Sequence, residues 1–393
     1  MRTIDDAERR ARLAVRHHLA VHAADVDAAA DAVVALHSSD PVTVYLSARA
    51  RVEGFSVRDL DDALYERRSL VRMLGMRRTL FVVPRATAAE MDAGCTKALA
   101  AGERLRLVRM LEEQGVADGD AGAWLEGVCA RTCAAIDARG TATAAEVTRD
   151  VPELALKLTF GEGKRWAATV GVSTRVLFLL ATDARLVRAR PVGTWISGQY
   201  RWAPVASWLG EDLPALDARQ ARAALLTRWL RAFGPGTTTD AKWWSGWTVA
   251  NTKTALDDVG AIEVALEQGG TAWVLPHDVE PPSGRAPRWI ALLPGLDPTV
   301  MGWKERAWYL GPHATALFDR NGNAGPTVWC DGRVVGGWAV VAPGKVAVRL
   351  LEDVGTAARR GIDAEAARLA TWFGDVRVTP RFRTPLEKEL VGR

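Results

Sequence analysis

The chain has 393 residues, and because domains usually hold about 100–200 residues, we expect several packed units rather than one small domain. Hydrophobic residues make up 48% and charged residues 25%, which is the ordinary globular range and excludes wholesale disorder. Lys and Arg total 51 against 47 Asp and Glu. The net charge of +4 therefore permits a polyanionic partner without requiring one.

Cysteine usage indicates a reducing compartment, and hydropathy indicates a soluble protein. The four cysteines are too few and too scattered for a disulfide framework, and the start MRTIDDAERR lacks the apolar core of a signal peptide. No run of about 18 apolar residues is free of charge, so we expect a soluble, cytoplasmic protein with no membrane partner. Cys129 and Cys133 lie one helical turn apart without zinc-spaced partners. We predict packing there, and neither a metal nor a cofactor.

The first part of the chain combines helical patterns with one strand. Apolar residues recur at helical spacing in VDAAADAVVAL, LDDALYERRSLVRML and AGAWLEGVCARTCAAI, which predicts helices there. A β-strand is predicted over residues 78–83, where an apolar run ends at Pro84. Two helices followed by a β segment are typical of a winged helix. We assign residues 1–90 to the first such unit.

Residues 91–210 are predicted to hold a helical linker and a second winged helix. The pattern begins with RGTATAAEVTRDVPEL and passes through a polar stretch at residues 160–166. It ends with STRVLFLLATDARLVRARPV and GQYRWAPV, which predict a helix and two strands.

The clearest copy of the pattern lies in residues 211–285. Thr238 or Thr239 is expected to cap a helix that ends at Trp247, and Thr248 to begin a second helix. Two β segments then flank a Gln-Gly-Gly turn. The order is helix, turn, helix and hairpin, and we assign these residues to a third winged helix.

The last part of the chain, residues 286–393, changes character. It contains the short β-rich runs RWIALLP, PTVWCDGRVVGGWAVV and KVAVRLL, separated by Pro and Gly. We interpret this region as a compact, β-barrel-like unit. The whole chain is then an α+β protein with three tandem winged helices and a C-terminal β unit.

Winged helices bind DNA through the second helix and the hairpin, although many contact proteins or only stack. Arg77 and Arg78 enter the predicted hairpin of the first unit, so we expect them to contact DNA. Trp243, Trp244 and Trp247 could stack on bases, but their helical spacing favours a place in the core.

Other charged positions have less context. Arg9, Arg12 and Arg16 share one face of a predicted helix, and we interpret that face as solvated. The surface is also the expected place of four histidines: His17, His18, His277 and His313.

Five segments together carry a resemblance to a known family: ALHSSDPVTVYLSARAR, MRRTLFVVPR, FGPGTTTDAKWWSGW, LLPGLDPTVMGWKER and FDRNGNAGPTVWCDGRVVGGW. In their order and spacing they resemble the winged-helix DNA glycosylases of the azinomycin-resistance, AlkZ-like type. This resemblance implies a C-shaped scaffold around double-stranded DNA and metal-free excision of bulky N7-alkylated purines, in some members from interstrand crosslinks. Repair or self-resistance to a genotoxin is the implied role, and we expect a monomer.

The segment LLPGLDPTVMGWKER matches a family motif, and we expect Lys304 or Arg306 to lie near DNA. In the alternative interpretation, Asp297 only caps a turn before Pro298 and the two cations are solvated.

The family's catalytic signature is glutamine, an apolar residue, then glutamine or an acidic residue, usually followed by Asp-Pro. Here His37 and Ser39 replace the two polar catalytic side chains, and Ser38 replaces the apolar spacer. A neutral imidazole accepts a proton from water, and a serine hydroxyl holds the same water, so we expect His37 to activate water with Ser39 as its partner. Asp40 belongs to the same candidate set, but before Pro41 we favour a helix cap.

Three functions from different classes are compatible with the sequence. The first is a DNA glycosylase for bulky or cationic purine adducts, based on the resemblance. The second is a non-catalytic winged-helix DNA-binding or regulatory protein, based on the loss of both glutamines. The third is a scaffold that uses its winged helices for protein contacts, based on the mild net charge.

Overall fold

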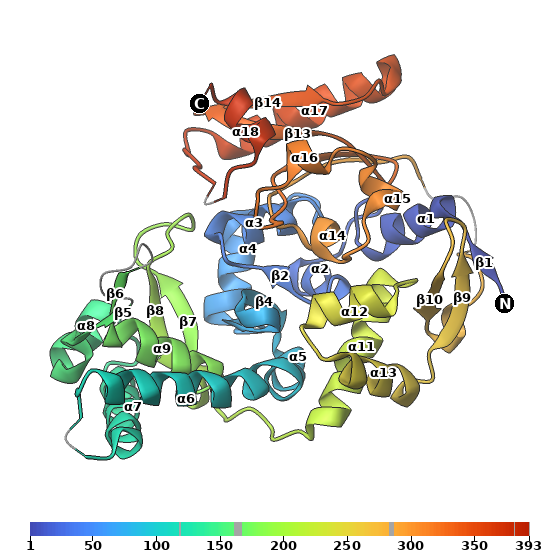
Figure 1. The fold of residues 1–393 in the computed structure, drawn as a ribbon. Coiled ribbons are helices and arrows are strands. Elements are labelled where there is room, and N and C mark those ends of the chain that lie inside the picture. Colours follow the sequence, from blue (N-terminus) through green and yellow to red (C-terminus); the bar gives the residue numbers. More distant parts are fainter. Residues whose placement is uncertain (118, 161–166, 283–286, 381, 393) are drawn as a thin grey trace.

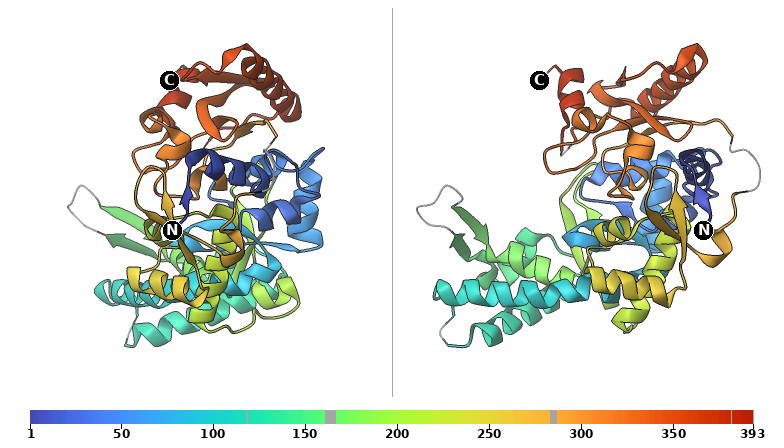
Figure 2. Two further views of the ribbon diagram at one scale, coloured as in Figure 1. Left: turned by 90° about the vertical axis from the view of Figure 1, so that its right-hand side faces the viewer. Right: turned by 45° about the vertical axis from the view of Figure 1, so that its right-hand side comes forward.

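The computed structural model describes residues 1–117, 119–160, 167–282, 287–380 and 382–392, and its fold is mixed α+β, as predicted. Figure 1 shows a central N-terminal part, a unit built on α6 to α9 at the lower left, and α11 to α13 at the lower right. In both views of Figure 2 the C-terminal sheet and helix α17 lie at the top and α6 and α7 at the bottom. Within the described ranges, no helix is long and apolar enough to cross a membrane.

The N-terminal part is organised around a three-stranded sheet. Its helices are α1 (Asp6–Arg16), α2 (Val26–Ala32), α3 (Pro41–Arg49) and α4 (Val57–Asp61), the last extended by a π-helical turn, Asp62–Glu66. Its strands are β2 (Leu36–His37), β3 (Leu70–Leu74) and β4 (Leu80–Pro84), in the order β2-β4-β3. A short strand, β1 (Thr3–Ile4), pairs instead with β9 (Ile262–Leu266).

The helix predicted to run through LVRML is wrong, because these residues form β3. Arg68 adopts a left-handed conformation with φ 55°, which ends the helical stretch just before the strand. All five residues of β3 are buried, so both faces of the strand are covered, and such a strand shows no alternation of polar and apolar residues.

The second part has its own hydrophobic core. Its elements are α5 (Arg85–Met91), a π-helical turn Asp92–Thr96, α6 (Lys97–Glu113), α7 (Ala121–Ala138), α8 (Ala144–Asp150), β5 (Lys157–Phe160), β6 (Ala168–Gly171), α9 (Val172–Thr182), β7 (Leu186–Pro191), β8 (Tyr200–Pro204) and α10 (Val205–Leu209). Buried residues of α6 to α9 and of β7 and β8 form that core. Residues 161–166, part of the predicted polar stretch, lie outside the described residues.

The third part follows the predicted order of helix, turn, helix and hairpin. Its elements are α11 (Ala218–Phe233), α12 (Thr238–Ser245), α13 (Val249–Asp258), β9 and β10 (Thr271–Val274). Thr248 caps α13 as predicted, by accepting a hydrogen bond from the Asn251 amide. The cap of α12 is Thr237, one residue before the predicted pair, and Gly246 ends this helix in the left-handed conformation with φ 78°.

The C-terminal part contains a four-stranded sheet with the order β11-β12-β13-β14. The strands are β11 (Ile290–Leu293), β12 (Thr327–Cys330), β13 (Arg333–Ala342) and β14 (Lys345–Leu350), and the helices are α14 (Pro298–Met301), α15 (Ala307–Leu310), α16 (Ala314–Leu317), α17 (Gly355–Phe373) and α18 (Pro385–Leu390). Among the described strands β11 and β14 do not pair, so the predicted barrel-like closure is not present. Instead, α17 contacts both outer strands, β11 and β14.

Helix α17 was missed because the region was interpreted as β-rich throughout. Its buried residues Ile362, Ala366, Leu369 and Phe373 recur at helical spacing. They pack with the sheet residues Val335 and Trp338 in one hydrophobic cluster. This apolar stripe was a readable helical signal, and it covers the sheet face that a closed barrel would have buried.

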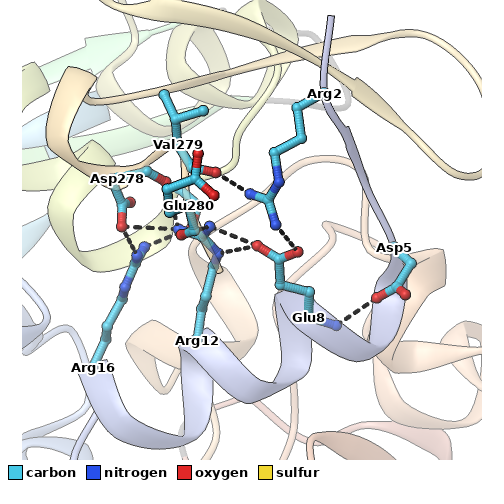
Figure 3. Close-up of polar contacts among 9 residues, drawn as sticks. Arg2, Asp5, Glu8, Arg12, Arg16, Asp278, Val279 and Glu280 are labelled. Atoms are coloured by element: carbon cyan, nitrogen blue, oxygen red, sulfur yellow. Dashed lines mark hydrogen bonds and ion pairs between the residues drawn. The ribbon is translucent and has the colours of Figure 1, made fainter. Parts of the chain in front are cut away.

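The basic face of α1 is not solvated, and that expectation is wrong. Arg12 is 2% exposed and pairs with Glu8 at 2.6 Å and with Asp278 at 2.8 Å, and Arg16 also bonds to Asp278. Figure 3 shows these arginines directed at the segment that carries Asp278, Val279 and Glu280. The helix packs against α11 and α15, which leaves the arginines to bond distant parts of the chain rather than a polyanion.

Candidate functional site

The residues predicted to be catalytic begin on strand β2. Leu36 pairs with Val82 and His37 with Phe81, while Arg72 lies opposite Val82 on β3. Because successive residues of a strand point to opposite faces, His37 shares a face with Phe81 and Met73, and Ser38 continues the face of Leu36 and Arg72. The sheet therefore divides the motif between two environments.

His37 is 7% exposed, with its ring edge-on to Phe81 at a centroid distance of 5.2 Å. The amide of Ser39 donates to its Nδ1 over 3.4 Å, a long hydrogen bond that places the lone pair of Nδ1 beside Ser39. Burial, together with the positive charge of Arg77, lowers the pKa of His37 to about 3. The imidazole is therefore neutral at pH 7.

Ser38 faces the opposite way, into the protein. It is 1% exposed, and its Oγ accepts a hydrogen bond from Arg72 Nε at 3.0 Å. Arg72 is equally buried and donates through Nη1 to the Tyr65 hydroxyl at 2.6 Å, while its guanidinium lies 4.5 Å from the centroid of the Tyr200 ring. The middle residue of the motif thus anchors the strand. Sequence reasoning missed this anchor because it placed Arg72 in a helix.

Asp40 caps helix α3, as predicted. Its Oδ1 accepts from the Val42 amide at 3.1 Å, and Pro41 occupies the first helical position. Asp40 also lines an apolar cavity between α3 and the C-terminal sheet. Its cap fixes the direction in which the chain leaves the His37–Ser39 segment.

Two predicted DNA-binding residues from distant segments meet on one tryptophan. The guanidinium of Arg77 lies 4.1 Å from the centroid of the Trp243 ring, and that of Arg306 lies 4.7 Å from it. Gly246 also contributes, since a side chain at this position would meet Arg77 Cγ at 3.0 Å. We call Arg77, Trp243 and Arg306 the arginine–tryptophan cluster.

One charge of this cluster, that of Arg77, acts on His37. Burial and the charge of Arg306 lower the pKa of Arg77 to about 10, so Arg77 stays protonated at neutral pH. Burial also lowers the pKa of Arg306, although Tyr309 and Asp240 oppose that effect. Two neighbouring cations repel each other, and an anion bound between them would relieve the repulsion. The cluster therefore concentrates two positive charges on one ring.

The remaining predicted residues lie elsewhere. Arg78 follows Arg77 directly, but its guanidinium pairs with Glu103 at 3.2 Å and lies 5.2 Å from the Phe178 ring, toward the second part. Lys304 is exposed, and its backbone amide donates to Asp240. Cys129 is buried in the second core, and no group of residues suited to hold a metal occurs in the described part of the chain.

Asp297 is an N-cap, as one interpretation predicted, but it is also completely buried. It caps α14 through the Thr299 amide and binds Arg51 through both oxygens, at 2.7 and 2.9 Å. Ser47 donates a further hydrogen bond to its Oδ2. Burial acts to raise the pKa of Asp297, but Arg51 and these hydrogen bonds outweigh it and hold the pKa below the usual range. The Ser47 hydrogen bond and this ion pair join α3 and the residues directly after it to the C-terminal part.

His17 belongs to the same buried network, and its predicted surface position is wrong. It is 0% exposed, with Nδ1 2.8 Å from Thr299 Oγ1 and Nε2 3.0 Å from the Ala232 carbonyl. Burial, with the charge of Arg51, lowers its pKa to about 3. No local pattern indicates these partners, because they lie more than 200 positions away.

We expect stability to fall on acidification below about pH 6.5. The unfolded chain protonates His17 near its ordinary pKa, whereas the folded protein does so only near pH 3, so the unfolded state binds more protons between these values. The contribution of His17 to the free energy of unfolding is fully present above this window. It decreases through the window by about 1.4 kcal/mol per pH unit, as it does for any histidine with a pKa lowered in this way. Urea unfolding from pH 7 to pH 5 checks this, and His17→Gln should flatten the dependence. An equal slope in both proteins would contradict it.

Comparisons with known proteins complete the description of the site. The family model of the AlkZ-like DNA glycosylases matches residues 30–372. The fold is similar to that of the DNA glycosylase AlkZ from Streptomyces sahachiroi, with a TM-score of 0.74, 20% sequence identity, and coverage of 96% of this chain and 99% of that one. Curated protein sequences give no significant match. The match to the family model spans most of the chain, so the protein belongs to the AlkZ-like DNA glycosylase family.

Proposed function

We propose that the protein hydrolyses the N-glycosidic bond of bulky N7-alkylated purines in double-stranded DNA, including interstrand crosslinks, without a metal. The observation that carries this proposal is the position of His37. Its neutral imidazole, with Nδ1 beside Ser39, occupies the family's catalytic slot and lies near the arginine–tryptophan cluster. Incubation with duplex carrying an N7-alkylguanine, followed by alkaline cleavage, tests the proposal.

The chemistry suits a weak base. An N7-alkylated purine is cationic, so when the bond from C1′ to N9 breaks, its electron pair neutralises the departing base. A water then attacks C1′ of an oxocarbenium-like sugar and loses its proton to Nδ1 of His37, which exchanges its long hydrogen bond from the Ser39 amide for one from the water. Attack makes this water strongly acidic, and a group with a pKa of about 3 suffices to accept the proton. Phosphates bound at Arg77 would offset the charge that otherwise opposes protonation of His37.

We interpret the three sets of helices and hairpins as winged helices on a C-shaped monomeric scaffold, with the DNA backbone at the arginine–tryptophan cluster. Arg77 comes from the hairpin β3–β4 and Arg306 from the segment between α14 and α15. Convergence of cations from two segments on one ring supports a phosphate contact near the catalytic slot. Lys304 is exposed and lies two residues from Arg306, and we propose that it contacts the same DNA backbone.

Arg77→Ala is expected to weaken binding about equally for different DNA sequences, because a phosphate contact carries no sequence information. The slope of the logarithm of affinity against the logarithm of salt concentration should fall by about one. Fluorescence anisotropy at several salt concentrations measures both effects. Arg78→Ala is the matched control, since Arg78 is paired with Glu103 and should change the slope less. An unchanged slope in Arg77→Ala would place the DNA elsewhere.

A non-catalytic DNA-binding protein is the second candidate, because both glutamines of the family signature are replaced. This candidate predicts sequence-specific binding and no abasic product from any adduct in a panel of alkylated duplexes. Abasic product from one of these duplexes would exclude it.

A further inference from the structure

An apolar cavity lies beside the catalytic segment, between α3 and the C-terminal sheet. Its walls are mostly apolar. They include Val42 and Leu46 of α3, Leu296 of the loop before α14, and Trp338 and Val340 of β13. Asp40 stands at its edge. Because Asp40 is three residues from His37, the chain between them spans at most about 10 Å. The cavity therefore lies within reach of a large group on the purine that His37 would serve.

One polar residue in the wall of this cavity has an unused hydrogen-bonding atom. Glu387 is 1% exposed, and its Oε2 accepts hydrogen bonds from the backbone and hydroxyl of Thr384, in the capping box of α18. Its Oε1 is buried and has no partner among the described residues. A buried polar atom without a partner is costly. Glutamine would serve the capping box equally well, so the cap alone does not explain a carboxyl group here.

We propose that this cavity receives the apolar ring substituent that a bulky alkylating agent leaves on N7, and that Glu387 forms a hydrogen bond to a polar group on that substituent. The inference rests on the proposed excision of N7-alkylated purines and names the residues that select among them. Sites for small organic groups are mostly apolar with few polar groups, as this cavity is. Burial, with the charge of Asp40, raises the pKa of Glu387 to about 7, so the carboxyl group can donate or accept.

Filling the cavity tests its role. Val340→Trp adds an indole from β13 and should lower kcat/KM at least tenfold on duplex carrying N7-(naphthylmethyl)guanine, while kcat/KM on 7-methylguanine duplex stays unchanged. Val15→Trp adds the same ring on α1, where Val15 is 48% exposed and outside the cavity lining, and should change neither value. Thermal unfolding identifies a variant that fails to fold, and Val340→Phe then repeats the test. Equal losses on both duplexes, or no loss, would overturn the proposal.

The role of Glu387 needs a different pair of substrates. In Glu387→Gln an amide NH₂ group, which only donates hydrogen bonds, takes the place of Oε1. An aromatic amine on the substituent, which also donates, then loses its acceptor. We expect kcat/KM to fall about tenfold on N7-(aminonaphthylmethyl)guanine and to stay unchanged on the naphthylmethyl analogue. Glu389→Gln, an exposed position on the same helix, is the control. A similar change on both adducts would reject the hydrogen bond.

Failure of the proposed function would be visible separately. If the wild-type protein releases neither 7-methylguanine nor N7-(naphthylmethyl)guanine, the glycosylase proposal fails. The role of the cavity is then tested by the affinity for the two duplexes, measured by fluorescence anisotropy. Preference for the naphthylmethyl duplex over the methyl duplex, lost in Val340→Trp, would support the cavity even then. Equal affinity of the wild-type protein for both duplexes would reject it.

Discussion

Replacing His37 with alanine is expected to lower the rate of base excision by about 10²–10⁴-fold, the usual contribution of a positioned general base. The imidazole contacts Phe81 and the amide of Ser39, and its Nδ1 is the basic atom next to the motif. DNA affinity should stay close to that of the wild-type protein, since the arginine–tryptophan cluster is intact. Single-turnover excision from N7-alkylguanine duplex measures the rate, and anisotropy measures the affinity.

Neighbouring variants separate this role from structural effects. Ser39→Ala should cost less activity than His37→Ala, because Ser39 only helps to hold the water. Asp40→Ala should lower stability by about 0.5–2 kcal/mol, the usual cost of an N-cap, and reduce excision only indirectly. If excision collapses in Asp40→Ala at unchanged stability but persists in His37→Ala, the carboxylate rather than the imidazole is the base.

Local signals in the sequence predicted much of the backbone. The caps at Asp40, Thr248 and Asp297 are each set by a side chain and an amide two or three residues away, so they depend on neighbouring residues alone. The failures have a different origin. Strand β3 was read as a helix because both of its faces are buried, and β-barrel closure was expected where α17 covers the sheet. In both cases the tertiary environment decides the structure.

The candidate site was predictable residue by residue but not as an arrangement. His37 and Arg306 could be named from their places in family motifs, and Arg77 from its charge in a predicted hairpin. That the two arginines share Trp243, and that Arg78 turns away to Glu103, depends on how distant segments pack. The inward anchor from Ser38 to Arg72 likewise follows from strand register, which no pattern in the motif specifies.

The buried pair of Arg51 and Asp297 should be the most sensitive point for stability outside the cores. Both side chains are 0% exposed, and Asp297→Ala leaves the guanidinium of Arg51 buried without its carboxylate. Removal of one partner of a buried ion pair usually costs about 3–5 kcal/mol, and we expect this loss in urea unfolding at pH 7. The loss should be similar for Arg51→Ala, which leaves the carboxylate unpaired.

Two comparisons show whether the loss comes from the stranded charge. The double variant Arg51→Met, Asp297→Leu removes both charges and fills the space, so it should lose less stability than either single variant. Arg359→Ala breaks an exposed pair with Asp363 on α17 and should cost less than about 1 kcal/mol. If the double variant is as unstable as the sum of the singles, packing and capping by Asp297 dominate instead of charge. The hydrogen bond from Ser47 to Asp297 would then be what joins α3 to the C-terminal part.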